Sequence, residues 1–227
     1  MEKIKVSELF YSIQGEGKYM GVPSIFLRTF GCNFTCGGFG MPKGKLSEER
    51  DTIAVNAENI KNYKDLPLVS TGCDSYASWD PRFKHLSPVR DIDYLACNIV
   101  DLLPRGRWYD EHLVITGGEP LLGWQRAYPE LLSHEKMRPL QELTFETNGT
   151  QLIADEFGKY LIEWTKHRLR DSITFSVSPK LSVSGEKWED AIKPDVVSNY
   201  KRYGFVYLKF VVATKEDVDE AEEAVNV

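Results

Sequence analysis

Short apolar runs, each followed by a turn of small or polar residues, constrain the fold of this chain more than any other feature of its sequence. The runs are rich in β-branched and aromatic residues, and such runs bounded by turn residues predict buried strands. The predicted strands cover residues 24–30, 113–116, 143–146, 173–176 and 207–212.

Helix-like segments lie between the predicted strands. Residues 91–103 place apolar side chains on one face, with Asp91 as the expected N-cap and Pro104 just past the end. Residues 157–169 behave similarly, behind a candidate cap at Asp155. Alternating strands and helices predict right-handed βαβ units, so we expect an α/β fold built on a parallel sheet.

Chemistry in parallel sheets gathers at the carboxyl ends of the strands. Cys32, the Gly117-Gly118-Glu119 turn, Asn148 and the Ser178-Pro179-Lys180 loop all fall at such ends. Each of the last three has an ordinary interpretation as a turn or a solvated side chain. Their shared position favours a common site.

Composition narrows the class of protein. The chain has 227 residues, 42% hydrophobic and 27% charged, so it is long enough to bury a core and is neither disordered nor fibrous. A formal net charge of -6 without a Lys/Arg run argues against a nucleic-acid surface. No apolar stretch is long enough for a membrane helix or resembles a signal peptide, so we expect a cytoplasmic protein with a small-molecule ligand and no membrane partner.

Residues 37–72 interrupt the alternation of predicted strands and helices. The segment is rich in Gly, Lys and Glu and has weak periodicity, with a single short helical pattern at 57–63. A long irregular stretch inside a compact domain is usually functional or mobile. We interpret it as an insertion within one domain that covers residues 1–227.

The four cysteines suggest metal or redox chemistry. Cys32 and Cys36 form a Cys-x3-Cys pair after a predicted strand, but two buried structural thiols explain that pair equally well. A metal site needs a third ligand, for which Cys73 at the end of the insertion is the candidate. Three thiolates without the spacing or histidines of a zinc site suit an iron–sulfur cluster with one open iron. Cys97, within a predicted helix, is assigned to packing or to an inert surface thiol.

Polar groups near the start of the chain suggest ligand recognition. Gln14 and Glu16 offer an amide and a carboxylate on a glycine-flexed loop, able to pair with a heterocycle that carries donors and acceptors. Arg28 lies in an apolar strand and needs an anionic partner, either in a structural ion pair or as a clamp on a ligand carboxylate. Its place near Cys32 favours the clamp.

Seven motifs in order resemble a known family, the 7-carboxy-7-deazaguanine synthases, which are radical S-adenosylmethionine (SAM) enzymes of queuosine and 7-deazaguanine biosynthesis. Each motif is weak alone, but the ordered set is highly specific and extends from Glu8 to about Val212. The motifs are SIQGEG at 12–17, GxP at 21–23, FLR at 26–28, GCN at 31–33, TGGEP at 116–120, ETNGT at 146–150 and SPK at 178–180.

The resemblance implies a partial, modified (β/α) radical SAM barrel with a long insertion in the cluster loop. It also implies a 4Fe-4S cluster held by three cysteines, with SAM on the fourth iron and cleaved on reduction to a 5'-deoxyadenosyl radical. The implied lyase reaction contracts 6-carboxy-5,6,7,8-tetrahydropterin to 7-carboxy-7-deazaguanine and releases ammonia, with Mg2+ assisting. A flavodoxin or ferredoxin-type electron donor and a homodimer are further implications.

Matching positions carry the family's roles onto this chain. The implied substrate contacts are Ile13, Gln14, Gly15, Arg28 and Thr116, with Glu16, Glu146 and Asn148 as weaker candidates. The implied SAM contacts are Gly72, Cys73, Asp74, Gly118, Ser178, Pro179 and Lys180. Cys32, Cys36 and Cys73 are the implied cluster ligands, and Ser75 stands where the family has the hydroxyl ligand of Mg2+, usually threonine.

Two features depart from the family pattern. The common spacing Cys-x3-Cys-x2-Cys would place its third ligand at Phe39, which cannot bind iron. We therefore predict that the insertion splits the motif into Cys-x3-Cys-x36-Cys and that Cys73 is the third ligand. The C-terminal end is also short for the family, whose members continue past the helix expected at 215–225 with a segment that helps close the substrate pocket.

Two other functions compete with this hypothesis. A glycyl-radical-enzyme activase shares the cluster loop and the GGEP motif, but it gives no reason for QGEG, Arg28 and ETNGT together. A non-catalytic metal-binding module would hold zinc at Cys32, Cys36 and Cys73.

Overall fold

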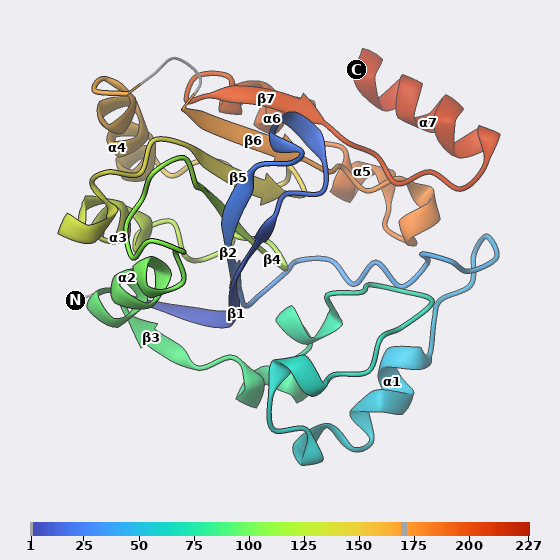
Figure 1. Cartoon of the computed structure of the whole chain (residues 1–227). Helices are drawn as coiled ribbons and strands as arrows, with labels where there is room; N and C mark the ends of the chain where they lie inside the picture. Colours follow the sequence, from blue (N-terminus) through green and yellow to red (C-terminus); the bar gives the residue numbers. More distant parts are fainter. Residues whose placement is uncertain (1, 169–171) are drawn as a thin grey trace.

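An open seven-stranded sheet forms the centre of the computed structural model, which describes residues 2–168 and 172–227 (Figure 1). The strand order is β3-β1-β2-β4-β5-β6-β7, so β3 and β7 are the edges. The five strands from β2 to β7 along this order pair in parallel, as predicted. They are β2 (Pro23–Thr29), β4 (His112–Gly117), β5 (Leu143–Thr147), β6 (Ile173–Val177) and β7 (Phe205–Leu208).

The prediction for the last strand is wrong in its bounds. β7 starts before Tyr207 and ends at Leu208, so Lys209 and the residues up to Val212 follow the strand. Because the strand ends at Leu208, Lys209 lies at the carboxyl end of the sheet, where the predicted site lies.

The sheet also has an antiparallel side that the sequence interpretation missed. β1 (Lys3–Ile13) pairs antiparallel with both β2 and β3 (Val89–Asp91). Its inward residues Ile4 and Val6 alternate with charged ones, as in a strand covered on one face, so it lacks the continuous apolar run of a buried parallel strand. The expected wholly parallel sheet is therefore a mixed sheet.

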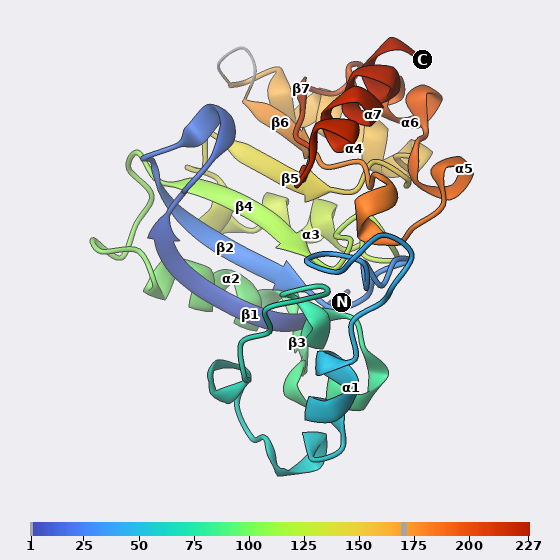
Figure 2. The same cartoon turned by 90° about the vertical axis from the view of Figure 1, so that its right-hand side faces the viewer.

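Helices cover one face of the sheet and enclose the largest core (Figures 1 and 2). Asp91 caps the predicted first helix as expected, since its carboxylate accepts a 2.8 Å hydrogen bond from the Tyr94 amide. Asp155 does not cap the next one; it occupies the first turn after Ala154, and the end predicted at Leu169 lies outside the described residues. The core-forming helices are α2 (Ile92–Asp101), α3 (Tyr128–Ser133), α4 (Asp155–Thr165) and α6 (Pro194–Tyr200).

Most of the insertion folds into a lobe below the sheet edge, which Figure 2 shows. It contains α1 (Glu49–Ala54), which the sequence did not predict, and two short 3-10 turns at 57–59 and 63–65 in place of one helix at 57–63. Its apolar residues pack with Tyr76, Phe83 and Leu86 in a second hydrophobic cluster. Two helices at the other end, the short α5 (Trp188–Ala191) and the longer α7 (Lys215–Asn226), complete the fold. No helix in the described residues is long and apolar enough to cross a membrane.

Candidate functional site

Alternation along the strands creates a polar face opposite the main core. Ile25, Leu27, Ile115 and Phe145 point into the core, so their neighbours point to the other side. The register then aligns one polar side chain from each of four adjacent strands. These side chains are Glu8, Arg28, Thr116 and Glu146.

Three of these side chains, Arg28, Thr116 and Glu146, form the floor of a cavity of about 700 Å³ that collects most of the predicted site residues. Gly15 and Pro179 are not among its lining residues, although their neighbours are. The predicted substrate contacts on its wall are Ile13, Gln14, Glu16, Arg28, Thr116, Glu146 and Asn148. The predicted cofactor and metal contacts on its wall are Cys32, Cys36, Gly72, Cys73, Asp74, Ser75, Gly118, Ser178 and Lys180.

Glu146 is the most constrained carboxylate of the cavity. Gln14 Nε2 donates a 3.0 Å hydrogen bond to one of its oxygens, and Thr116 Oγ1 donates a 3.0 Å bond to the other. Lys209 Nζ lies 3.9 Å from Glu146 Oε1 and also contacts the Glu16 carboxylate. Burial lowers the pKa of Lys209, but the two carboxylates outweigh it and raise the pKa above its ordinary value.

Lys209 was missed by the sequence interpretation because it was assigned to a strand interior. Its contact with Glu16 spans 193 positions of sequence, and no local sequence pattern predicts a pair so far apart. The cavity therefore holds an ammonium group beside two carboxylates, a set that can bind both the donors and the acceptors of one ligand.

Arg28 has protein partners on two sides. Its Nε lies 3.2 Å from Glu8 Oε2, and its Nη1 donates a 3.0 Å hydrogen bond to Ser75 Oγ. Arg28 therefore forms a structural ion pair, as one interpretation predicts. It also lines the cavity, as a clamp on a ligand carboxylate requires. Ser75 in turn donates a 3.1 Å bond to Asp74 Oδ1.

The three predicted cluster ligands lie around one end of the cavity. Cys32, Cys36 and Cys73 share a small cluster with Phe34 and Phe39. Two donors point at their sulfurs: the Phe34 amide lies 3.4 Å from Cys32 Sγ, and Trp79 Nε1 lies 3.4 Å from Cys73 Sγ. Hydrogen bonds to sulfur stabilise thiolate ligands, so this environment suits cluster binding.

Burial favours the protonated form of the three thiols. Burial raises the pKa of Cys32 to about 12, and it also raises the pKa of Cys36 and Cys73. The described residues contain no group of three His, Cys, Asp or Glu side chains set to hold a single metal ion. Three thiolates that each bind a different iron of a cluster need not converge on one point, so the donor set still fits an iron–sulfur cluster.

Gly117 and Gly118 allow the loop that carries Cys32 and Cys36, here called the cysteine loop, to lie against the end of β4. A Cβ on Gly118 would fall 2.4 Å from the Gly31 carbonyl oxygen and 2.7 Å from Cys32 Cβ. Gly117 has φ +146, and its Cβ would fall 2.2 Å from Thr29 O. The two glycines predicted at this strand end are therefore required by the close approach of two backbones.

Glu119 holds the neighbouring turn from inside the protein. It is fully buried, and its carboxylate accepts hydrogen bonds from Leu121 N, Thr147 Oγ1 and Asn148 N at 2.7 to 3.0 Å. Burial raises the pKa of Glu119 to about 6, although these hydrogen bonds act to lower it. Asn148 then reaches the cysteine loop through a 2.9 Å bond to Asn33 Oδ1.

Glu186 is a second support that the sequence interpretation missed. Its Oε1 accepts hydrogen bonds from the amides of Thr35 and Cys36 at 2.9 and 2.8 Å. Cys36 has a positive φ of 48, so the loop takes a conformation that side chains rarely adopt, and Glu186 holds it there. A single glutamate in a turn carries no motif that could have identified it.

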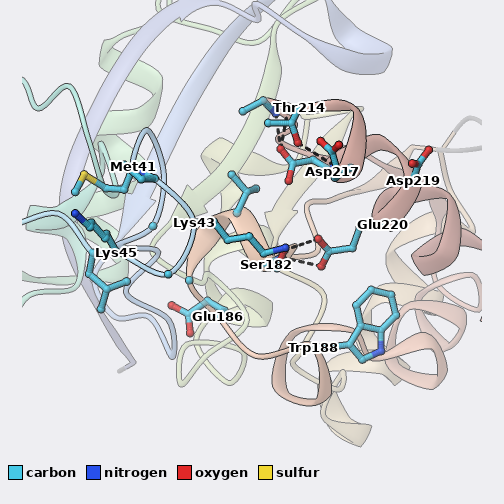
Figure 3. A pocket seen from close by; sticks show the side chains of 18 of the residues that line it. Met41, Lys43, Lys45, Ser182, Glu186, Trp188, Thr214, Asp217, Asp219 and Glu220 are labelled. Carbon is cyan, nitrogen blue, oxygen red and sulfur yellow. Dashed lines mark hydrogen bonds between the residues drawn. The ribbon is translucent and has the colours of Figure 1, made fainter.

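A second, larger cavity of about 1230 Å³ lies outside this site (Figure 3). It separates residues 38–46 of the insertion from α7, and Lys43 points toward Glu220 of that helix. Ser182 ties α7 to the body through hydrogen bonds of 2.8 and 2.6 Å to Glu220. None of the predicted site residues lines this cavity.

Comparison with known proteins gives one consistent result, although no protein-family model matches the chain. It is 28% identical over 225 residues to the 7-carboxy-7-deazaguanine synthase of Pyrobaculum aerophilum, covering 98% of this chain and 73% of the relative. Identity is 25% over 228 residues with the enzyme of that name from Buchnera aphidicola, covering 98% and 88%. The chain is also 30% identical over 196 residues to the 7-carboxy-7-deazaguanine synthase of Halobacterium salinarum. This match covers 85% of this chain and about half, 51%, of the relative.

A solved structure gives the same indication for the fold. The crystal structure of QueE from Escherichia coli aligns with a TM-score of 0.54 at 19% identity, covering 99% of this chain and 78% of that one. The chain is therefore a relative of the 7-carboxy-7-deazaguanine synthases, as the order of its motifs predicts.

Proposed function

We propose that this chain is a 7-carboxy-7-deazaguanine synthase, which contracts 6-carboxy-5,6,7,8-tetrahydropterin to 7-carboxy-7-deazaguanine and releases ammonia. The observation that carries the proposal is that one cavity joins the three cysteines to the polar floor of the sheet. A radical formed at the cysteine end would have the substrate within the same enclosure.

The residues around the cysteines suit the cofactors that this reaction requires. Cys32, Cys36 and Cys73 would hold the 4Fe-4S cluster, and Ser75 offers the oxygen that Mg2+ prefers. When bound, the cluster and SAM supply the radical that starts the ring contraction, and Mg2+ supplies a Lewis acid. The SAM contacts that we propose are Gly72, Cys73, Asp74, Gly118, Ser178, Pro179 and Lys180.

The opposite wall suits the pterin. A pterin presents ring N–H and amino donors on one edge and a carbonyl acceptor beside them, which the Glu146 carboxylate and the amide of Gln14 can pair with. Phe10 and Phe26, stacked with ring centroids 5.0 Å apart, add an apolar surface for a flat ring. Arg28 offers its guanidinium to the substrate carboxylate. Ile13, Gly15, Glu16, Thr116 and Asn148 complete the proposed substrate pocket.

We extend the proposal to the architecture and the partners. Residues 1–227 would form a single radical SAM domain, in which the parallel strands make a partial, modified (β/α) barrel and residues 37–72 are the insertion. The reaction needs a one-electron donor, for which a flavodoxin or ferredoxin is the proposed class. A homodimer in the cytoplasm is the proposed state.

The test is anaerobic reconstitution of the chain followed by addition of dithionite, SAM, Mg2+ and 6-carboxytetrahydropterin. We expect 7-carboxy-7-deazaguanine by mass spectrometry, a Cys73→Ala variant without product, and a Cys97→Ala control with the product of the unaltered chain. A fully cluster-loaded protein that makes no deazapurine would contradict the proposal. A Cys73→Ala variant with a complete cluster spectrum and activity would contradict only the ligand set.

A further inference from the structure

The insertion must close on itself for Cys73 to lie beside Cys36. Thirty-six residues separate these two cysteines, and the entropy cost of closing a loop grows with its length. We call residues 37–47 and 70–72 the base of the insertion. A backbone hydrogen bond from Gly72 N to Phe39 O at 2.7 Å joins its two segments, and a second, from Ser47 N to Gly37 O at 2.8 Å, folds the first segment back on itself.

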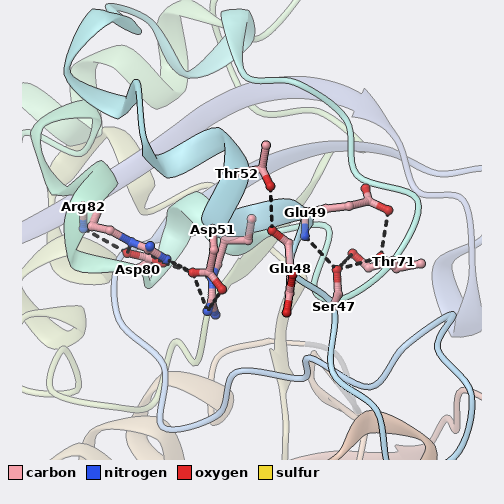
Figure 4. Close-up of polar contacts among 9 residues, drawn as sticks. Ser47, Glu48, Glu49, Asp51, Thr52, Thr71, Asp80 and Arg82 are labelled. Carbon is pink, nitrogen blue, oxygen red and sulfur yellow. Dashed lines mark hydrogen bonds and ion pairs between the residues drawn. The ribbon is translucent and has the colours of Figure 1, made fainter.

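Glu49, the first residue of α1, supplies the side-chain contacts that close the base (Figure 4). Its Oε2 accepts a 2.7 Å hydrogen bond from Ser70 N. Its Oε1 accepts bonds of 2.5 Å from Ser70 Oγ and 2.7 Å from Thr71 Oγ1. Ser47 Oγ lies 2.6 Å from the same Thr71 hydroxyl. One carboxylate thus binds the segment that ends at Cys73.

The opposite side of α1 is fixed to the chain that follows Cys73. The guanidinium of Arg50 lies 5.0 Å from the centre of the Trp79 ring, and Trp79 Nε1 is the donor to Cys73 Sγ. Asp51 accepts a 2.7 Å bond from Arg82, which also pairs with Asp80 (Figure 4). Helix α1 therefore contacts both the residues before Cys73 and those after it.

We propose that Glu49 is a positioning residue whose carboxylate holds the returning end of the insertion and so places Cys73 beside Cys32 and Cys36. The inference rests on the proposed function, since it gives Cys73 the role of a cluster ligand. It explains how a loop of this length can interrupt the cysteine motif without displacing the third ligand.

Glu48 provides a matched control. It precedes Glu49 directly and is exposed, and its carboxylate makes no hydrogen bond or ion pair with the described part of the chain. Glu48→Ala and Glu49→Ala remove the same charge from the same turn, so a difference between them reports the contacts with Ser70 and Thr71.

The experiment measures iron and sulfide per chain, the absorption spectrum of the cluster and the rate of iron loss to a chelator, with no turnover needed. Loss of a residue that orients a metal ligand typically costs about 10–100-fold in affinity, so we expect Glu49→Ala to lose iron roughly tenfold faster than Glu48→Ala. Thr71→Val, which removes one donor from the other side, should act in the same direction. Glu49→Gln keeps one acceptor oxygen and should restore part of the retention.

A double variant tests the route of the effect. In a Cys73→Ala background, Glu49→Ala should cause no further loss of iron, because the ligand that it places is already absent. Equal iron retention in Glu49→Ala and Glu48→Ala, while Cys73→Ala loses iron, would overturn the role of Glu49 and leave the proposed function intact. Full retention in Cys73→Ala would instead overturn the ligand set. Circular dichroism of the metal-free variants tests whether each is folded. If Glu49→Ala fails this check, Thr71→Val replaces it and is judged by the same outcomes.

Discussion

Thr116 Oγ1 on β4 donates a 3.0 Å hydrogen bond to Glu146 Oε2 on the adjacent strand β5, on the floor of the cavity. A hydrogen bond to a charged group contributes about 1.5–3 kcal/mol, so Thr116→Val, which keeps the shape and removes the donor, should release the carboxylate from one fixed orientation. We expect KM for the pterin to rise about tenfold while the cluster spectrum stays unchanged. Steady-state kinetics check this, and an unchanged KM would show that Thr116 does not orient Glu146 for the substrate.

Lys209 should contribute to substrate affinity through charge. Replacing it as Lys209→Met leaves Glu16 and Glu146 without their shared cation. The cavity becomes more negative, so binding of the anionic pterin should weaken, and the loss should shrink as added salt screens the repulsion. Lys201→Met removes the same charge from an exposed position and serves as the control. Equal affinities for the two variants would place Lys209 outside the substrate pocket.

The position of the site was predictable because parallel strands end at one edge of a sheet. Gly118, Asn148 and Lys180 each follow a predicted strand, and the structure brings them to the same cavity. That inference needs only strand order and direction, which short apolar runs reveal.

The supports of the site were not predictable, since they depend on contacts between distant segments. Glu186 meets Cys36 across 150 positions, and Lys209 meets Glu16 across 193. The antiparallel strand β1 was missed for a related reason: it is covered on one face, so its alternating pattern resembles a surface segment. Its partners, and the hairpin that carries Gln14, follow only from the three-dimensional pairing.

Gly118→Ala should prevent cluster binding. The added Cβ would meet Gly31 O at 2.4 Å and Cys32 Cβ at 2.7 Å, so the cysteine loop must move away from β4. Gly37→Ala is the matched control, because it lies next to Cys36 but its Cβ would have only ordinary contacts at 3.5 Å with Leu46. We expect iron content to fall sharply in the first variant and to persist in the second. Similar iron contents would mean that the loop tolerates this displacement.

Two buried groups should give the stability of the chain opposing responses to acid. His112 is fully buried between Ser24 and Thr144, and burial lowers its pKa to about 3. As the pH falls from about 6.5, the unfolded chain protonates this histidine and the folded chain does not, so the free energy of unfolding decreases by up to about 1.4 kcal/mol per pH unit. Glu119, with its pKa raised to about 6, holds a proton in the folded state between pH 6 and its ordinary value of 4.5, so it opposes that loss there.

His112→Gln separates these contributions. The free energy of unfolding of the unaltered chain minus that of the variant should fall as the pH decreases from about 6.5 towards 3, because only the unaltered chain carries the buried histidine. Below pH 4.5 the Glu119 contribution is complete, so the acid limb of the unaltered chain should steepen there. Urea unfolding at a series of pH values measures the difference. A difference that stays constant over this range would mean that His112 is protonated as readily in the folded chain as in the unfolded one.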